Sequence, residues 1–551
     1  MSLRPQVFYL VPEDTARVAR PATPKGNVYL RMYDALGTIF ADQQFTALFP
    51  SHGQPAEAPV RLALTTLMQF AEGLSDRQAA DAVRTRLDWK YLLCLELTDP
   101  GFHFSVLGAF RDRLIAGGAE HLLLDTLLGH FRDLGLLKAR GKQRTDSTHV
   151  LAAVRSLNRL KRVGETMRAA LNSLAVVAPA WLQERVPTDW YDRYAARVEN
   201  YRLPKADSAR TTLATEIGQD GRSLLAWIDD SSAPAYLHAI PAVQTLRQVW
   251  REQYTEPPDP LTLRAVTTLP PAGQQIASPY DPEARYATKR SVDWVGYKVH
   301  LTETCDRERP CLITHVETTI ATVPDDQVVA PIHQALAAKD LLPADHLLDA
   351  GYTTARNLAE SATTYQVDLQ GPIAEDASWQ GRAGKGFAKQ DFRVDWENRQ
   401  VTCPAGVVSR SWTSNASTPK EYAFVVHWAK RDCRDCAYRS HCTKRGKEQP
   451  RELLLKPHAE ETAMQTARQR QSTAAFEAQY ALRAGVESAH AQGIRRCDLR
   501  HARYRGLAKT KLQHVLTAAA LNLVRVSAWM AETPRAATRR SPFARLRAST
   551  A

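Results

Sequence analysis

The sequence predicts an α/β protein, in which a mixed sheet flanked by helices carries large insertions and follows an α-helical N-terminal domain. Two observations support this fold class. Between Val28 and Leu137, apolar residues recur mostly at three- and four-residue steps, which is typical of packed helices. From Gly296 onward the pattern alternates as in half-buried strands, first in GYKVHLTET and then in CLITHVETTI.

Length and composition set the limits of the prediction. A chain of 551 residues exceeds one ordinary domain, so two or three folded units are expected. Hydrophobic residues make up 44% and charged residues 24%, which is ordinary for a globular protein with its own core. No apolar run has the length of a membrane span, and the N-terminus lacks the pattern of a signal peptide. We therefore expect a cytoplasmic protein.

The net charge predicts a polyanionic partner. The chain carries a formal charge of +13 and has a pI near 9.3. From Arg483 to the C-terminus there are fourteen Lys/Arg and three Asp/Glu residues, a net charge of +11. A nucleic acid is the partner that such a basic segment favours. A solvated basic tail is the alternative that charge alone leaves open.

The N-terminal part is expected to hold a DNA-binding domain. Residues 1–26 are predicted to be an extended lead-in and residues 27–138 a helical domain. Within it, LALTTLMQFAEGLSDRQAADAVR resembles a helix–turn–helix, with Gly73 closing one helix. Ser75 caps the next helix, and its spacing to Gln78 matches a capping box. A helical hairpin of an ordinary bundle is the alternative.

A larger domain is predicted over residues 139–530. A strand-like segment at 143–155 is followed by a helical insertion at about 156–285 and by the two alternating strands. A helix at 331–338, a short buried strand at 346–348 and a strand at 365–369 come next. This order is compatible with an RNase H-like domain that carries an insertion after its first strand.

The last part of this domain is predicted to be helical after a second insertion. Residues 376–450 form a polar insertion that contains cysteines. Residues 458–492 have no Pro and one Gly, which predicts one long helix. A second helix is expected over residues 507–530, and residues 531–551 are expected to be a basic, disordered tail.

Two aspartates follow or end predicted strands. Asp146 lies in RTDSTHV and Asp349 in HLLDAGYTT. A carboxylate at the end of a buried strand is costly to desolvate without a partner, and Mg²⁺ is one such partner. Each aspartate alone is equally typical of a turn or a cap. Lys298 and His300 share one strand face, and a solvated or hydrogen-bonded strand face explains them at least as well as a catalytic site does.

A third element lies near the C-terminus. Tyr480, Arg483 and Glu487 are spaced at i, i+3 and i+7, so a continuous helix would present all three on one face. Arg483 could bind a phosphate, Tyr480 could stack or donate a hydrogen bond, and Glu487 could complete a metal site. A solvated face with an intrahelical ion pair is the alternative.

These motifs together resemble the DDE transposases of bacterial insertion sequences, in the branch with an InsH-like helical N-terminal domain. The resemblance rests on DST after a strand, on LLDAGYTT, and on Tyr–x2–Arg–x3–Glu followed by RYRGLAKTKLQHVLTAAALNLVR. It extends from about Leu62 to Val526.

The resemblance implies an RNase H-like catalytic domain in which Asp146, Asp349 and Glu487 bind two Mg²⁺ or Mn²⁺ ions. The implied reaction is cleavage and strand transfer of double-stranded DNA, at the terminal inverted repeats of the element and in target DNA. A homodimer, associated with the bacterial nucleoid, is implied as well. A catalytically inactive DNA-binding protein or repressor, and a metal-dependent nuclease without strand transfer, are the alternatives.

The predicted DNA contacts lie around and beyond the third carboxylate. The related motif has a Lys after six intervening residues, but here that position is Ile494, with Arg495 and Arg496 next. Basic residues interleaved with an aromatic residue suit DNA phosphates. The predicted contacts are Tyr480, Arg483, Arg495, Arg496, Arg503, Arg505 and Lys509.

One group of cysteines has the spacing of a zinc site. Cys403, Cys433, Cys436 and Cys442 are separated by 29, 2 and 5 residues. This spacing predicts a structural Zn²⁺ in a ribbon or knuckle, with His441 as an alternative fourth ligand. Reduced thiols without a metal are the other interpretation. The remaining cysteines are expected to be packing residues.

Overall fold

The computed structural model describes residues 2–534 and residue 543, apart from residues 7–8, 156, 200, 202, 257–259, 290, 377, 384–386, 415–422, 445 and 447–448. The chain divides into two compact units. The first comprises residues 1–137, 307–313 and 516–551, and the second comprises residues 138–306 and 314–515. Most of the predicted tail, residues 535–551, lies outside the described residues. No helix in the described part of the chain is both long enough and apolar enough to cross a membrane.

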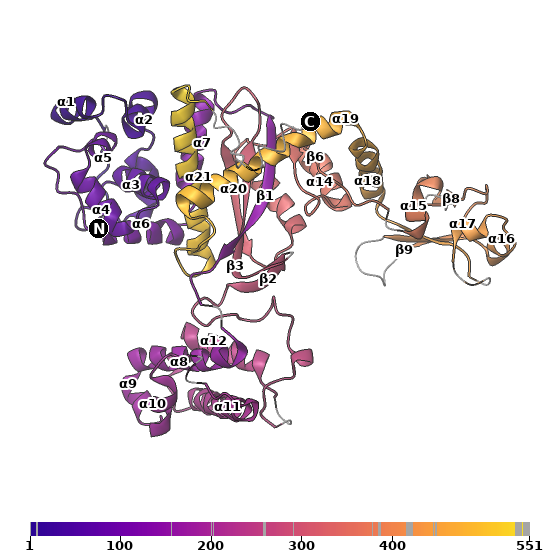
Figure 1. Cartoon of the computed structure of the whole chain (residues 1–551), viewed down its shortest axis with the longest axis horizontal. Helices are drawn as coiled ribbons and strands as arrows, with labels where there is room; N and C mark the ends of the chain where they lie inside the picture. Colours follow the sequence, from indigo (N-terminus) through magenta and orange to yellow (C-terminus); the bar gives the residue numbers. More distant parts are fainter. Residues whose placement is uncertain are drawn as a thin grey trace. The chain divides into compact units, whose positions relative to one another are not determined.

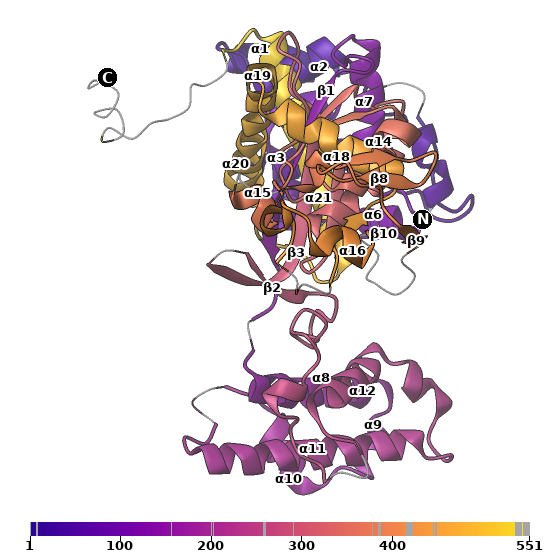
Figure 2. The same cartoon turned by 90° about the vertical axis from the view of Figure 1, so that its right-hand side faces the viewer.

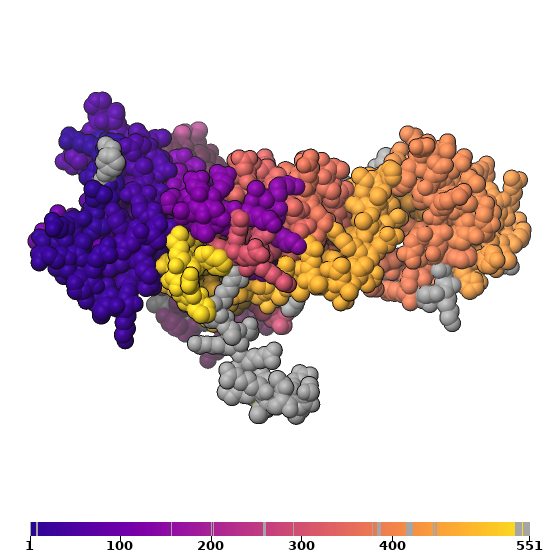
Figure 3. Space-filling model, turned by 90° about the horizontal axis from the view of Figure 1, so that it is seen from above, coloured from indigo at the N-terminus to yellow at the C-terminus, as the bar shows by residue number. Residues whose placement is uncertain are grey.

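The first unit is a helical body, indigo in the space-filling view of Figure 3. It contains α1 (Glu13–Ala22), α2 (Val28–Leu36), α3 (Pro59–Glu72), α4 (Asp76–Thr85), α5 (Leu87–Leu92), α6 (Ser105–Ala116) and α7 (Leu122–Asp133). The predicted extended lead-in is wrong at α1. This helix forms because Ala19 is buried with Leu30 and Tyr91, a tertiary contact that local pattern does not report.

The predicted helical hairpin corresponds to α3 and α4. Gly73 ends α3 in the left-handed conformation, with φ 72°, where a side chain would be strained. Ser75 begins α4 and accepts a hydrogen bond from the backbone N–H of Gln78, whose side chain in turn accepts from the Ser75 N–H. Twelve of the fourteen residues of α3 are buried, so α3 is a core helix and α4 is the exposed member of the pair.

The second unit is built around a mixed sheet (Figure 1). Its strands are β1 (Lys142–Leu151), β2 (Arg285–Lys289), β3 (Val292–Thr304), β4 (Ile313–Ile320), β5 (Asp345–Leu347) and β6 (Asp368–Gln370), although Ile313 itself is assigned to the first unit. The order is β2-β3-β1-β5-β6, with β4 also paired to β3. Strand β1 runs antiparallel to β3 and parallel to β5, and β5 runs parallel to β6.

This topology is RNase H-like, so the predicted fold class is confirmed. Helices flank the sheet: α13 (Val329–Ala337) packs on α14 (Ala355–Tyr365), which contacts β6, and α20 (Val486–Cys497) contacts β1 and β3. Helix α14 continues to Tyr365, and Gln366 ends it at φ 54°. The strand predicted at 365–369 therefore begins later, at Asp368, because the last helical turn takes its first residues.

The first insertion is a helical body with its own core (Figure 2). It contains α8 (Arg159–Val177), α9 (Pro179–Gln183), α10 (Thr188–Tyr194), α11 (Asp207–Asp229) and α12 (Pro241–Gln253). Helices α11 and α12 approach closely at Gly221, where an added Cβ would lie 2.1 Å from the Trp250 ring. Trp250 donates its ring N–H to the Gly218 carbonyl at 3.0 Å, which fixes the helix pair.

The second insertion is a small β-rich body. It contains β7 (Arg393–Asp395), β8 (Gln400–Thr402), β9 (Ser411–Ser414), β10 (Phe424–His427) and β11 (Glu452–Leu455), together with the short helices α15 (Trp379–Ala383), α16 (Lys430–Arg434) and α17 (Arg439–Cys442). Strands β11, β10 and β9 form one sheet, and β7 pairs with β8. A separate group of buried residues forms its core: Phe392, Val401, Val426, Trp428, Leu453 and Leu455.

The single long helix predicted over residues 458–492 is wrong. The segment contains α18 (His458–Gln471), α19 (Ala474–Tyr480), the 3₁₀ helix η7 (Ala481–Gly485) and α20. Thr473 caps α19 through a hydrogen bond from the Phe476 N–H, which breaks the helix after α18. The second predicted helix of this part of the chain, α21, spans Leu507–Met530, as predicted.

Candidate active site

Asp146 lies in the central strand of the sheet. Strand β1 pairs with β3 over nine residues, and Asp146 stands opposite Leu301 in this register. One carboxylate oxygen, Oδ1, accepts a hydrogen bond from the Ser147 backbone N–H at 2.8 Å. The side chain is 15% exposed, so Asp146 is partly buried.

Asp349 reaches the same edge of the sheet from the neighbouring parallel strand. Strand β5 pairs with the beginning of β1, and Asp349 follows β5 by two residues. Its Oδ1 accepts the Gly351 N–H at 2.8 Å, which closes the turn that leads into α14. Parallel neighbours place their carboxyl ends together, and that brings Asp349 toward Asp146.

Arg483 joins the two aspartates. Its Nη2 lies 2.8 Å from Asp146 Oδ2 and 3.6 Å from Asp349 Oδ2. Burial raises the pKa of Asp349, and the negative charge of Asp146 raises it further, whereas Arg483 opposes the shift. The two aspartates therefore repel each other unless a cation lies beside them. In this structure the guanidinium of Arg483 is that cation.

A second arginine fixes the segment that carries Arg483. Arg144 of β1 forms a buried ion pair with Glu303 of β3 at 2.7 Å and donates a hydrogen bond to the Leu482 carbonyl of η7. At Gly485 an added Cβ would lie 2.1 Å from Arg144 Nη1, so only glycine allows this approach. The 3₁₀ turn is thus held against β1, which aims Arg483 at the aspartates.

Glu487 lies at the beginning of α20 with an exposed side chain. The buried face of α20 carries His490, whose Nε2 lies 3.1 Å from the backbone oxygen of Asp146. Burial lowers the pKa of His490, and the neighbouring Asp146 opposes that shift. His490 thereby fixes α20 on β1 one helical turn after Glu487. The face predicted to carry Tyr480, Arg483 and Glu487 together is not one helix face, because η7 interrupts it.

Asp325 is a third carboxylate near the pair, and the sequence analysis missed it. It accepts a hydrogen bond from Lys298 Nζ at 2.8 Å and one from Ser147 Oγ at 3.3 Å. Burial alone would raise the pKa of Asp325, but the hydrogen bond and charge of Lys298 hold it below its usual value. The available signal was an acidic pair in VPDDQV directly after β4, which is equally typical of a helix cap.

Lys298 and His300 both point to this side of the sheet. Lys298 binds Asp325, and His300 Nδ1 lies 2.7 Å from the hydroxyl of Tyr352. Burial lowers the pKa of His300 to about 4, so the ring is neutral at neutral pH. The strand face that carries these residues is buried and both side chains are hydrogen-bonded, so of the predicted alternatives the hydrogen-bonded face is the one observed and the solvated face is not.

The predicted DNA contacts differ in exposure. Tyr480 is half-buried and stacks on Phe476 with ring centroids 5.4 Å apart. Of the predicted basic contacts on and after α20, four are exposed and Arg503 is half-buried. The exposed ones are Arg495, Arg496, Arg505 and Lys509. Arg505 lies 5.5 Å from the ring centroid of Tyr280, in the chain that follows the helical insertion.

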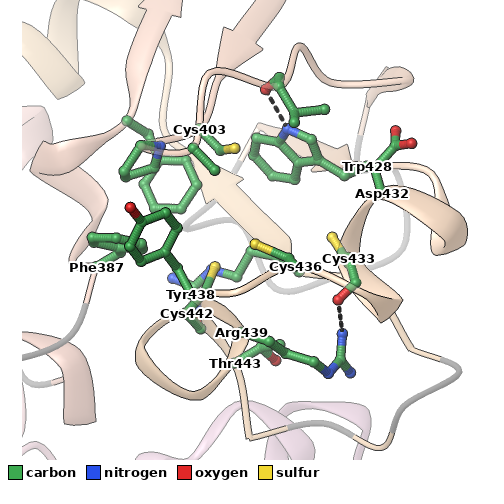
Figure 4. Close-up of a pocket in the computed structure, with 15 residues that line it drawn as sticks. Phe387, Cys403, Trp428, Asp432, Cys433, Cys436, Tyr438, Arg439, Cys442 and Thr443 are labelled. Carbon is green, nitrogen blue, oxygen red and sulfur yellow. Dashed lines mark hydrogen bonds between the residues drawn. The ribbon is translucent and has the colours of Figure 1, made fainter.

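The four predicted zinc ligands border one pocket in the second insertion (Figure 4). Cys403, Cys433, Cys436 and Cys442 are all partly exposed, and none forms a disulfide. Of the other cysteines, Cys94, Cys305 and Cys497 are buried, which agrees with packing roles.

The aspartates at the sheet edge have the chemistry of a metal site but not its geometry. In the part of the chain that the structure describes, no three His, Cys, Asp or Glu side chains are already arranged to hold a metal. At the sheet edge, however, Asp146 and Asp349 already share one cationic group, which is the charge pattern that a divalent cation needs. The chemistry of these two carboxylates therefore fits Mg²⁺. Glu487, four residues after Arg483, lies in the first turn of α20.

Comparison with known protein families agrees with the fold. Residues 402–527 match the model of a transposase DDE domain. Residues 18–113 match the model of a transposase domain of the DUF772 type. Two separate segments of the chain are thus similar to transposase domains. The resemblance of the chain to the DDE transposases of insertion sequences, predicted from the motifs, is thereby confirmed.

The two matches differ in what they cover. The DDE match includes Glu487, Arg483 and the four clustered cysteines, whereas Asp146 and Asp349 lie outside both matched segments. The DDE domain assigns the chain to the nuclease and transposase class of enzymes. No curated protein and no solved structure matches the chain.

Proposed function

We propose that the chain is an active transposase that binds the ends of an insertion sequence and cleaves and rejoins DNA strands with divalent metal ions. The observation that carries the proposal is the approach of Asp146 and Asp349 to one guanidinium, that of Arg483, at the edge of an RNase H-like sheet. A DNA-binding repressor on this fold would have no use for two adjacent, partly buried aspartates that need a cation.

Asp146 and Asp349 would hold Mg²⁺ or Mn²⁺, with Glu487 as a further ligand. Bound metal supplies Lewis-acid activation of a water or 3′-hydroxyl and stabilises the leaving oxygen of an in-line displacement. The chain itself supplies the positions. Asp146 is fixed by the β1–β3 pairing and Asp349 by its turn, so the two carboxylates need little reorganisation.

Arg483 has a second role in this proposal. A guanidinium binds phosphate oxygens in a bidentate manner as readily as it binds carboxylates. If Asp146 and Asp349 bind a metal ion, Arg483 would be released from both carboxylates and would be available to bind a non-bridging phosphate oxygen of DNA. Lys298 stays with Asp325, because that pair is more deeply buried.

The DNA path is supported by a basic pocket within the second unit. The pocket has a volume of about 580 Å³ and begins directly after β1, the strand of Asp146. Its lining carries five cationic side chains and one carboxylate, that of Glu165. The cationic residues are Arg155, Lys161, Arg168, Arg197 and Arg505. Such an excess of positive charge favours a phosphate backbone.

The test is a cleavage and strand-transfer assay with the full chain, Mg²⁺ and DNA that carries the ends of its own element. The unmodified protein is expected to nick at the ends and join the freed 3′-hydroxyl to target DNA. Asp146→Asn, Asp349→Asn and Glu487→Gln are each expected to lose both products while still binding DNA.

The matched control is Glu477→Gln, which changes an exposed carboxylate of α19 outside the site and should leave activity unchanged. Cleavage without joining would support the metal-dependent nuclease instead. Retained cleavage in Asp146→Asn would overturn the metal mechanism. Two active sites acting on paired ends require a homodimer on DNA, which mass photometry of the protein with and without end DNA measures.

A further inference from the structure

The cysteine pocket of the second insertion is assembled from two separate stretches of chain (Figure 4). Cys403 stands in the turn after β8, where the Gly406 N–H donates to the Cys403 carbonyl at 2.9 Å. Gly406 has φ 83°, a conformation that favours glycine, so the turn is specific to this CPAG sequence. The other three cysteines come from α16, α17 and the turn between them.

The space between the four thiols is small and largely apolar. The cavity has a volume of about 30 Å³, enough for one ion or one water molecule. Its remaining wall is rich in aromatic side chains, namely Phe387, Phe392, Trp428 and Tyr438. Such a wall gives a water molecule few hydrogen-bond partners, whereas a metal ion needs only the sulfurs.

The thiols are close enough to affect one another. Cys403, Cys433, Cys436 and Cys442 all line the same cavity of about 30 Å³. Four thiolates are therefore mutually unfavourable here unless a cation lies among them. A thiophilic divalent ion removes this penalty and releases the protons.

Two arginines are placed to balance the charge that would remain. A divalent ion with four thiolates carries a net charge of −2. Arg439 donates from Nη1 to the Cys433 carbonyl at 2.7 Å, and Arg451 donates to the Cys442 carbonyl at 3.2 Å.

The insertion also has a physical need for a cross-link. Its core contains only six buried hydrophobic residues in the described part of the chain. Bodies of this size rarely reach adequate stability from apolar burial alone and are often held by metal ions or disulfides. Here no disulfide is present among the described cysteines.

We propose that Cys403, Cys433, Cys436 and Cys442 bind one structural Zn²⁺ ion. The side chains are not yet at metal-binding geometry, so the ion draws the four sulfurs inward to tetrahedral Zn–S distances of about 2.3 Å. His441 is excluded from the ligand set because it does not border the cavity, although it precedes Cys442. The ion ties the Cys403 turn to the α16–α17 segment and leaves the sheet edge of Asp146 independent of zinc.

The experiment measures zinc in the full chain, expressed in zinc-supplemented medium and purified without chelators. We expect about one zinc per chain for the unmodified protein and for His441→Ala, the matched control from the same segment. Cys433→Ser/Cys436→Ser is expected to retain less than about a tenth of that amount, as loss of two of four ligands predicts.

A cobalt measurement keeps the proposal testable if the cysteine variant does not fold. Exchange of the unmodified protein into Co²⁺ is expected to give the intense thiolate charge-transfer and ligand-field bands of a tetrahedral four-sulfur site, unchanged in His441→Ala. Absence of zinc together with absence of these bands would overturn the proposal. A spectrum altered by His441→Ala would overturn the four-cysteine ligand set.

Discussion

Nη2 of Arg483 lies 2.8 Å from Oδ2 of Asp146, so a residue of the C-terminal helical segment neutralises a carboxylate of the first strand. The same nitrogen lies farther, at 3.6 Å, from Asp349. Arg483 thus neutralises the charge of Asp146 well and that of Asp349 incompletely. Replacing each aspartate with asparagine should therefore change the free energy of unfolding in opposite directions.

Asp349→Asn removes a like charge whose pKa is already raised by burial and by Asp146. The free energy of unfolding without metal should rise by about 0.5–1 kcal/mol, whereas Asp146→Asn should lower it by about 1–2 kcal/mol. Urea unfolding at pH 7 with EDTA measures both. Equal destabilisation by the two substitutions would contradict the arrangement around Arg483.

Gly485→Ala tests the positioning of η7. The new Cβ would meet Arg144 Nη1, which cannot easily retreat because its ion pair with Glu303 is buried. We expect a loss of about 1–3 kcal/mol in stability and a larger relative loss of cleavage rate, since Arg483 shifts with the turn. Gly446→Ala, where an added Cβ meets no atom within 4 Å, is the control. Unchanged activity in Gly485→Ala would show that the contact is dispensable.

Asp325→Asn tests the buried pair with Lys298. Removing one charge leaves the other buried without its partner, so unfolding should become easier by about 3–5 kcal/mol. Asp325→Asn/Lys298→Met removes both charges and should recover a large part of that loss. A double variant as unstable as the sum of the single variants would mean that the two residues act independently.

Acid should destabilise the second unit through buried histidines. Burial lowers the pKa of His300 and His333 to about 4 and that of His514 to about 3, from a usual value of 6.5. The folded state therefore favours the neutral rings, so their contribution is complete above pH 6.5 and is lost as the pH falls toward 4. Each ring adds a slope of up to about 1.4 kcal/mol per pH unit.

Unfolding by urea at a series of pH values between 7 and 4 measures that slope. His514→Gln removes one titrating ring and should flatten the dependence. A pH profile identical to that of the unmodified protein would rule out His514 as a contributor.

The basic pocket should contribute to DNA affinity in a salt-dependent way. Arg197→Ala/Arg505→Ala is expected to weaken DNA binding and to reduce the slope of log affinity against log salt by up to about 1.8, about 0.9 for each lost phosphate contact. Fluorescence anisotropy between low and physiological salt measures it. Arg222→Ala, on an exposed position of α11 outside the pocket, is the control. An unchanged slope in the double variant would remove the pocket from the DNA path.

Sequence patterns predicted the sheet because its strands have strong local signals. Alternation gave β3 and β4, and the short apolar run before Asp349 gave β5. Patterns failed where tertiary contacts override propensity. The helix predicted over 458–492 has one weak local signal at η7, the single glycine Gly485, which a helix can tolerate. The close approach of Gly485 to Arg144 is a tertiary contact that the sequence pattern does not show.

The site could be predicted only in part for a similar reason. Asp146 and Asp349 were found because strand ends and motif order are visible in the sequence. Asp325 was not, because a carboxylate in a turn has no periodicity, and its importance comes from Lys298 across the sheet edge. The role of Arg144 depends on long-range partners as well, and no spacing rule predicts them.

The helical insertion after β1 delays the pairing of β1 with β3 during synthesis of the chain. On the ribosome, β1 leaves the exit tunnel well before β3, and at about 5–20 residues per second it waits on the order of ten seconds for that neighbour. Arg483 is synthesised later than both strands. A translation product that ends between Leu151 and Arg483 contains Asp146 and its strand but lacks the guanidinium that pairs with this carboxylate, so its candidate site should be incomplete.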